Sequence, residues 1–296
     1  MKHIAVIGLG AMGGAMASTL SRTGWDVTGV DPSEEAREKA CSNGVTPSSD
    51  ISTVVGHEYV LMSLPNADLV RDTVPKVLSQ PGTVAIVDTT TSDPGTSREM
   101  SKLAREQGTA FVDAPVSGGR VGAASGTLSA FVGGSESDLE KSRSVLETLT
   151  SGAFKHLGGP GAGNVVKLIN NALSATNLIA TGEALAIAQA WGVDPEIAAQ
   201  SVSAATGTSR ATSHMYPDWI LSGTYDSGFS TGLMARDIAL AVQIGQEVGS
   251  DPAVLNRASS IWEQTREHIG TNSDFSEIGK LLIPDLDLQN ASHEQR

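Results

Sequence analysis

Short apolar runs alternate with helical patterns through the first half of the chain. The runs cover residues 3–8, 26–31, 59–64, 84–89, 110–116 and 128–133. Most of them lack a strict apolar–polar alternation, which is typical of strands that are covered on both faces. Between the first runs, residues 11–23 and 33–43 follow the helical period. This alternation of strands and helices predicts an α/β domain with a doubly wound parallel sheet.

The pattern changes near residue 160, and the second half of the chain predicts only helices. Residues 163–191 contain no proline and place apolar side chains at helical spacing, so we expect one helix ~42 Å long. Gly192 can end it. Further helices are predicted near residues 195–205, 232–248 and 252–268. We therefore expect a sheet domain over residues 1–162 and an all-helical domain over residues 163–296, which begins with the long helix.

Composition narrows the class of partner. The 296 residues include 20 Lys+Arg and 33 Asp+Glu, a net charge of −13, which argues against nucleic acid and membrane surfaces. A single cysteine, Cys41, excludes an intrachain disulfide framework, and the six histidines have no metal-ligand spacing. The chain enters a strand-like run at once, so no secretory signal is expected. We expect a cytoplasmic protein with a small-molecule partner and no metal.

A glycine string, G-L-G-A-M-G, joins the first apolar run to the first helical pattern. In that context it predicts a phosphate-binding turn. Gly8 permits the tight turn, Gly10 lets the backbone approach a pyrophosphate, and Gly13 lets helix and strand pack closely. The alternative is a glycine-rich turn of another α/β protein, such as a flavodoxin-like one. The candidate cofactor-binding residues here are Gly8, Leu9, Gly10, Ala11, Met12 and Gly13.

Asp31 ends the second apolar run, 18 residues after Gly13. A carboxylate at this point can accept both hydroxyls of an adenosine ribose, and it would repel a 2′-phosphate. The sequence therefore favours NAD over NADP as cofactor. A second interpretation makes Asp31 the cap of the helix that follows, and the two roles are compatible.

Three longer motifs resemble the β-hydroxyacid (3-hydroxyisobutyrate-type) dehydrogenases. GLGAMGGAMASTL at 8–20 resembles the family's N-terminal fingerprint, DAPVSGG at 113–119 its substrate-binding motif, and GAGNVVKLINN at 161–171 its catalytic-lysine motif. DTTTSDP at 88–94 and residues 229–240 match more loosely. The resemblance covers nearly the whole chain. It implies a Rossmann domain, a long interdomain helix, a helical second domain and a homodimer or homotetramer. The implied activity interconverts small 3-hydroxy acids and semialdehydes with NAD(P).

The lysine motif supplies a candidate proton-transfer group. Lys167 and Asn171 are four residues apart, on one face of the predicted helix. A lysine in water has a pKa of ~10.4 and is a poor base at neutral pH. Burial and the positive charge of an oxidised nicotinamide both lower the pKa of a lysine. We expect Lys167 to move the hydroxyl proton and Asn171 to hold the substrate hydroxyl or orient the amine. The alternative is a lysine that merely extends to solvent near a helix end.

The substrate motif ends in small residues that can bind an anion. Successive N–H groups at Ser117, Gly118 and Gly119 can form a nest for a substrate carboxylate, with the Ser117 hydroxyl as a further donor. Arg120 follows directly and is a further candidate for substrate binding. The alternative is an ordinary glycine turn.

Further cofactor contacts are expected where the third and fourth runs end. In a doubly wound sheet the carboxyl ends of the strands face the cofactor, which points to Leu64, Pro65, Asn66 and Thr91. Turn formation is the alternative for the first three. Arg236 stands where the family usually has the lysine of a Lys-Asp pair. Arginine keeps the charge and changes the hydrogen-bonding shape. Arg236 is thus a candidate cofactor contact, with a surface ion pair as the alternative.

Two other functions remain open at this point. The strings LPNADLVR at 64–71 and GGPGAGNVVKLINN at 158–171 are also similar to the sulfolactaldehyde reductases of the family. Those have an arginine-containing loop in place of Ser-Gly-Gly, so the retained loop favours a carboxylate over a three-carbon sulfonate. The second alternative is a dinucleotide-binding scaffold without activity. Retention of Lys167, Asn171 and the loop together favours an NAD-dependent oxidoreductase that acts on a small 3-hydroxy acid.

Overall fold

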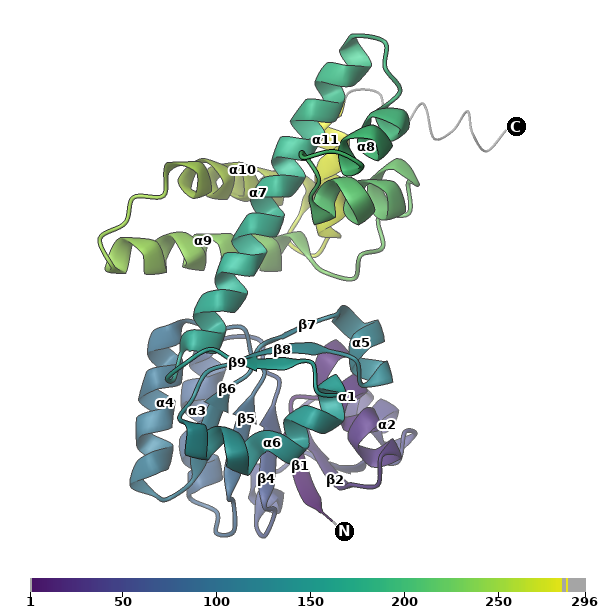
Figure 1. The fold of residues 1–296 in the computed structure, drawn as a ribbon. Coiled ribbons are helices and arrows are strands. Elements are labelled where there is room, and N and C mark those ends of the chain that lie inside the picture. The colour runs from purple at the N-terminus through teal and green to yellow at the C-terminus, as the bar shows by residue number, and fades with distance from the viewer. Residues whose placement is uncertain (1, 284–285, 287–296) are drawn as a thin grey trace. The chain divides into compact units, whose positions relative to one another are not determined.

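The structure is a computed structural model that describes residues 2–283 and 286 (Figure 1). The chain divides into two compact units, Met1–Lys167 and Leu168–Arg296. The expected boundary between residues 162 and 163 stays a prediction. An α/β unit followed by a helical one is the fold class that the sequence predicts, and the structure confirms it.

The first unit is built on a six-stranded parallel sheet in the order β3-β2-β1-β4-β5-β6. Its strands are β1 (His3–Ile7), β2 (Asp26–Val30), β3 (Thr46–Ser48), β4 (Tyr59–Met62), β5 (Ala85–Asp88) and β6 (Ala110–Asp113). The strand order reverses between β1 and β4. In such sheets a ligand binds at this switch point, beyond the carboxyl ends of the strands.

Both faces of this sheet are buried, which explains the unbroken apolar runs. Ile4 and Val6 of β1 belong to one apolar cluster, whereas Ala5 and Ile7 belong to another. Helices α1 (Ala11–Arg22), α2 (Glu34–Cys41) and α6 (Glu136–Thr150) contribute to the first cluster. Helices α3 (Ala67–Leu78) and α4 (Pro94–Glu106) contribute to the second. Successive residues of β1, β4, β5 and β6 thus enter different cores.

The structure corrects two of the predicted strands. The run at 110–116 is broken: β6 ends at Asp113, and Pro115, which has no N–H to donate to a ladder, precedes β7 (Val116–Ser117). The run at 128–133 does form a strand, β8 (Ser129–Val132), but this strand lies outside the parallel sheet. It pairs antiparallel with β7 and parallel with β9 (Phe154–His156). The three-residue strands β3 and β9 were not predicted, because they are too short for a periodic pattern.

The named elements of the second unit's described residues are all helices, apart from an isolated β-bridge between Ser230 and Asp274. The core of this unit includes residues of the long helix α7 (Ala162–Ala190). The indole of Trp262 donates to the Ala175 carbonyl (3.2 Å) and the hydroxyl of Tyr216 to that of Leu178 (2.9 Å). The other helices are α8 (Pro195–Ser203), the π-helix η2 (Ala211–Leu221), α9 (Thr231–Glu247), α10 (Ala253–Ile269), the 3₁₀ helix η3 (Phe275–Ile278) and α11 (Gly279–Leu282). Within residues 2–283 and 286, no helix combines the length and apolarity that a membrane crossing needs.

Candidate functional site

The glycine string forms a tight turn between β1 and α1. Gly8 has a φ of +91°, and a Cβ on it would lie 2.2 Å from the Ser63 carbonyl oxygen. A Cβ on Gly13 would lie 1.9 Å from the carbonyl oxygen of Gly8. By contrast, a Cβ on Gly10 would meet no described atom within 4 Å. Two glycines therefore allow close packing and the third faces open space, as the approach of a pyrophosphate requires.

The first turn of α1 has amides that a ligand can use. The helix starts after Gly10, and neither a capping side chain nor an acidic residue stands in its described first turn. Helices α2, α3 and α4 are instead capped by Ser33, Asn66 and Asp93. The N–H groups and the positive end of the α1 dipole are thus suited to an anion.

Asp31 is tied to the glycine turn. Its Oδ2 accepts a hydrogen bond from the Leu9 amide (2.7 Å), and its Oδ1 accepts one from the Ser33 amide (2.8 Å). Ser33 itself caps α2, by accepting from the Ala36 amide. Each carboxylate oxygen has a second acceptor direction. Asp31 therefore shapes the turn and still has the capacity to accept a ribose hydroxyl.

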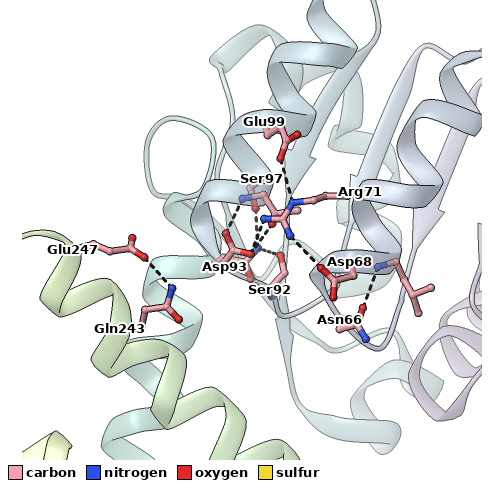
Figure 2. Close-up of polar contacts among 12 residues, drawn as sticks. Asn66, Asp68, Arg71, Ser92, Asp93, Ser97, Glu99, Gln243 and Glu247 are labelled. Carbon is pink, nitrogen blue, oxygen red and sulfur yellow. Dashed lines mark hydrogen bonds and ion pairs between the residues drawn. The ribbon is translucent and has the colours of Figure 1, made fainter.

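The segments after β4 and β5 are held by helix caps (Figure 2). The Leu64 amide donates to the Thr90 hydroxyl (3.0 Å), and the Asn66 side chain caps α3 at the Leu69 amide (3.0 Å). Arg71 links α3 to α4 through ion pairs. Its partners are Asp68, Asp93 and Glu99. The turn-forming role of Asn66 is therefore real, and the cofactor contacts of Leu64, Pro65, Asn66 and Thr91 stay predictions.

Lys167 is bonded to the loop that carries the substrate motif. Its Nζ donates to the carbonyl oxygen of Val116 at 2.8 Å, directly before Ser117. Gly118 and Gly119 follow with φ angles of +121° and +60°, which favour glycine. Lys167 and Ser117 are half-buried, whereas Arg120 is exposed. Two motifs about fifty residues apart in the chain are thus joined within the first unit.

Two buried residues that sequence reasoning missed support this arrangement. Asp113 accepts from the Gly161 amide with Oδ1 (2.7 Å) and from the Asn164 amide with Oδ2 (2.9 Å). The Asn164 side chain is fully buried and bonds to Ser92 and Ser97. Both residues are part of the quoted motifs, and that was the only signal for them in the sequence.

Asp88 is a second buried carboxyl beside Asp113. The two residues are cross-strand partners at the ends of β5 and β6. Oδ1 of Asp88 accepts from the Thr90 amide (3.0 Å), and Oδ2 has no hydrogen-bond partner among the described residues. Burial raises the pKa of Asp88 to about 7, against the opposing effect of the Thr90 hydrogen bonds. Burial likewise raises the pKa of Asp113 to about 6, although backbone amides oppose the rise.

Replacing Asp88 with asparagine should stabilise the protein at alkaline pH and not near pH 4. A carboxyl with a pKa of about 7 when folded and 3.8 as its ordinary value binds more protons in the native state between those values. The free energy of unfolding therefore falls as pH rises through that window. The asparagine variant escapes this loss, which is about 1.4 kcal/mol for each unit of pKa difference.

Urea unfolding of wild type and Asp88→Asn across pH 4 to 8 would measure this difference. Asp50→Asn is the control. Hydrogen bonds from Ser52 lower the pKa of this exposed carboxyl, so Asp50→Asn should not gain stability relative to wild type as pH rises from 4 to 8. A stability difference between wild type and Asp88→Asn that does not change with pH would contradict the assignment.

In the second unit, Asn171 belongs to a buried polar chain. Its Nδ2 donates to Asp237 Oδ2 (2.7 Å), and its Oδ1 accepts from Asn170 (3.1 Å). Arg236 donates from Nε and Nη2 to Asp237 Oδ1 (3.0 and 2.8 Å). Arg236 thus forms an ion pair, as the alternative interpretation expected. The pair does not lie on the surface, because its carboxylate, Asp237, is only 1% exposed. Asn171 keeps one N–H and one lone pair for a ligand, and Asp237, which sequence reasoning did not select, sets its orientation.

Known proteins match the chain over both units. A family described as the NAD binding domain of 6-phosphogluconate dehydrogenase matches residues 3–158. A second, described as the NAD-binding region of NADP-dependent 3-hydroxyisobutyrate dehydrogenase, matches residues 161–282. The chain is 33% identical to the 2-(hydroxymethyl)glutarate dehydrogenase of Eubacterium barkeri, over 94% of each protein. It is 34% identical to the NAD-dependent L-serine dehydrogenase of Pseudomonas aeruginosa, over 96% of this chain and 99% of that one.

Solved structures agree with these sequence matches. The structure of a Mycobacterium tuberculosis 3-hydroxyisobutyrate dehydrogenase with L-serine matches with a TM-score of 0.88 and 33% identity. The match covers 95% of this chain and 99% of that one. An imine reductase of Streptomyces aurantiacus, 21% identical, matches with a TM-score of 0.64 and shares the fold.

Proposed function

The chain belongs to the β-hydroxyacid dehydrogenase family, and from that premise we propose that it interconverts a small 3-hydroxy acid and its semialdehyde, with Lys167 as the proton-transfer group. The family and the relatives support an NAD-dependent hydroxy acid dehydrogenase. One observation supports the proposed role of Lys167 and the 3-hydroxy acid substrate. The hydrogen bond from Lys167 to the Val116 carbonyl puts an amine beside a loop suited to a carboxylate.

The glycine turn and Asp31 are the residues that would hold the dinucleotide. The open space at Gly10 and the uncapped first turn of α1 fit a pyrophosphate. The carboxylate of Asp31 fits the hydroxyls of the adenosine ribose. When bound, NAD supplies the hydride acceptor for the oxidation.

The proposed chemistry needs an anion site and a base. The amides of Gly118 and Gly119 and the hydroxyl of Ser117 hold the substrate carboxylate. Lys167 Nζ takes the hydroxyl proton while the C–H bond breaks and its electron pair leaves as hydride. In reduction the same amine returns the proton to the developing alkoxide. Asn171 follows on the same helix, and its amide is the proposed partner of the substrate hydroxyl.

The relatives narrow the substrate class. They are dehydrogenases of L-serine, 3-hydroxyisobutyrate and 2-(hydroxymethyl)glutarate. Each of these compounds is a 3-hydroxypropionate with a substituent on carbon 2. We infer that this chain takes the same core, a primary alcohol one carbon away from the carbon that bears the carboxylate.

Incubation of purified protein and NAD⁺ with isomeric acids tests the proposal. NADH should form with 3-hydroxypropionate or its 2-substituted derivatives, including L-serine and 3-hydroxyisobutyrate. Lactate, the 2-hydroxy isomer of 3-hydroxypropionate, is the matched control and should give none. Turnover only with dihydroxypropanesulfonate would establish the sulfonate alternative. If the protein binds NAD but neither oxidises any of these acids nor reduces any of their aldehydes, the dinucleotide-binding scaffold would be favoured.

Substituting Asp31 should relax the preference for NAD. Asp31→Ala removes the charge that would repel a 2′-phosphate, and also the hydrogen bonds to Leu9 and Ser33. Asp31→Asn keeps an acceptor oxygen, so it separates the effect of charge from that of turn geometry. We expect the ratio of kcat/KM for NAD to that for NADP to fall about tenfold or more in both variants, since a hydrogen bond to a charged group is worth ~1.5–3 kcal/mol. An unchanged ratio would overturn the role of Asp31.

A further inference from the structure

The hydrogen bond of Lys167 closes a ring that begins and ends at Asp113. From Asp113 the chain runs three residues to Val116, whose carbonyl accepts from Lys167. From Lys167, α7 leads back one turn to Asn164, whose amide donates to the Asp113 carboxylate. The Asp113 side chain therefore joins the start of the lysine helix to the strand that leads into the substrate loop.

Asn164 joins the same helix turn to a second loop. Its Oδ1 accepts from the Ser92 amide (2.9 Å), and its Nδ2 donates to the Ser97 hydroxyl (3.0 Å). Ser92 follows Thr91, the predicted cofactor contact. The first turn of α7 is thus bonded to the segment after β5 and, through Asp113, to the segment after β6.

We propose that Asp113 and Asn164 are positioning residues, which clamp the first turn of α7 so that the Lys167 amine is fixed at the Val116 carbonyl. This inference rests on the proposed function, in which that amine moves the proton. A lysine side chain has four flexible carbons and little directional preference of its own. Its amine stays in one place only when the backbone that carries it and the acceptor it meets are both fixed.

The packing around the clamp leaves little freedom for the helix start. A Cβ on Gly163 would lie 2.2 Å from the Phe131 carbonyl oxygen and 2.6 Å from that of Asp113. A Cβ on Gly133 would lie 2.8 Å from the amide nitrogens of both Ala162 and Gly163. Backbone therefore packs directly on backbone here, without side chains that could adjust between them.

Capping alone does not account for a buried carboxylate at this position. Helix α8 is capped by Asp194, which accepts from the amides of Glu196 (2.8 Å) and Ile197 (3.3 Å) and is exposed. Asp113 makes the same kind of contact from a fully buried position, where a charge is costly to desolvate. This desolvation cost falls on the carboxylate that binds the amide of Asn164, three residues before Lys167. We therefore assign the buried carboxylate to the placement of the proposed proton-transfer group.

The test compares Asp113→Asn with Asp194→Asn, the same chemical change at two helix starts. In Asp113→Asn we expect kcat to fall by about 10²-fold, the effect of a small misplacement of a catalytic group. The Kd for NAD should stay within about twofold, since the glycine turn is untouched. Asp194→Asn should keep the kcat of wild type. Equal kcat in all three proteins would overturn the proposal.

A readout without substrate separates this proposal from the proposed function. Lys167 is acetylated with a limiting amount of an amine-reactive acetylating reagent. Mass spectrometry then gives the ratio of acetylation at Lys167 to that at Lys102, an exposed lysine of α4. Release of the clamp should raise this ratio in Asp113→Asn and leave it unchanged in Asp194→Asn. An unchanged ratio would refute positioning even if the enzyme were slow. Conversely, a raised ratio in a protein whose Lys167→Ala variant is fully active would support the clamp and refute the proposed function.

Asn164→Ala supplies a second variant if Asp113→Asn does not fold. It keeps the backbone amide that donates to Asp113 and removes the bonds to Ser92 and Ser97. The labelling ratio should again rise and kcat should again fall, by a smaller factor than in Asp113→Asn. Wild-type values for both quantities in a folded Asn164→Ala protein would overturn the proposal.

Discussion

Replacing Lys167 with alanine should lower kcat for hydroxy acid oxidation by about 10²-fold or more, the usual contribution of a positioned acid–base group. The reason is local, because Lys167 Nζ lies 2.8 Å from the Val116 carbonyl at the edge of the proposed carboxylate loop. NAD binding should be retained, since the glycine turn and Asp31 belong to other segments of the first unit. Steady-state kinetics and a binding titration with NAD would measure the two effects separately.

Lys167→Arg is the matched control for the alanine variant. Arginine preserves the positive charge but stays protonated at every working pH, so it cannot act as a base. We expect it to be nearly as slow as the alanine variant and to lose the rise of kcat/KM with pH that a lysine base produces. An arginine variant with wild-type activity would show that the charge matters and that proton transfer does not. Near-normal turnover in Lys167→Ala would remove the residue from the mechanism altogether.

Gly13→Ala should weaken cofactor binding strongly and destabilise the first unit. A Cβ at this position would lie 1.9 Å from the carbonyl oxygen of Gly8, closer than any real contact. Because that oxygen belongs to the backbone of the turn, α1 must move away from β1. Overpacking of this kind costs about 1–3 kcal/mol or more. Thermal unfolding without NAD should therefore show a lower Tm, and the affinity for NAD should fall by about 10²-fold or more, since the turn geometry carries the site.

Gly10→Ala separates folding from binding at the same turn. Gly10 has a φ of −60°, and its Cβ would meet no described atom within 4 Å, so alanine fits the protein without strain. The Tm without NAD should stay close to that of wild type. The affinity for NAD should still fall, because the methyl group would occupy the space through which a pyrophosphate approaches the backbone. Wild-type NAD affinity in Gly10→Ala would refute the phosphate site at this turn.

The sequence by itself predicted features that depend on local pattern. The apolar runs identified a sheet buried on both faces, since successive residues such as Ile4 and Ala5 enter different cores. The glycine string and Asp31 predicted the turn, and the structure adds the hydrogen bond from Leu9 to Asp31 that connects them. The absence of strand signals after residue 160 predicted the long helix, which spans Ala162–Ala190. Each of these rests on steric or periodic rules that act over a few neighbouring residues.

Only the tertiary structure decided how distant segments meet. Pro115 divides a run that reads as one strand, and the residues after it pair with β8 in a second sheet. Asp113 and Asp88 read as ordinary polar residues at strand ends, yet they become buried cross-strand partners, and Asp237 becomes the acceptor for Asn171. The bond between Lys167 and Val116 spans fifty-one positions of the chain. Contacts of this kind depend on strand order and helix packing, which single-residue patterns do not encode. Burial and pairing of polar groups are therefore properties of the fold rather than of the local sequence.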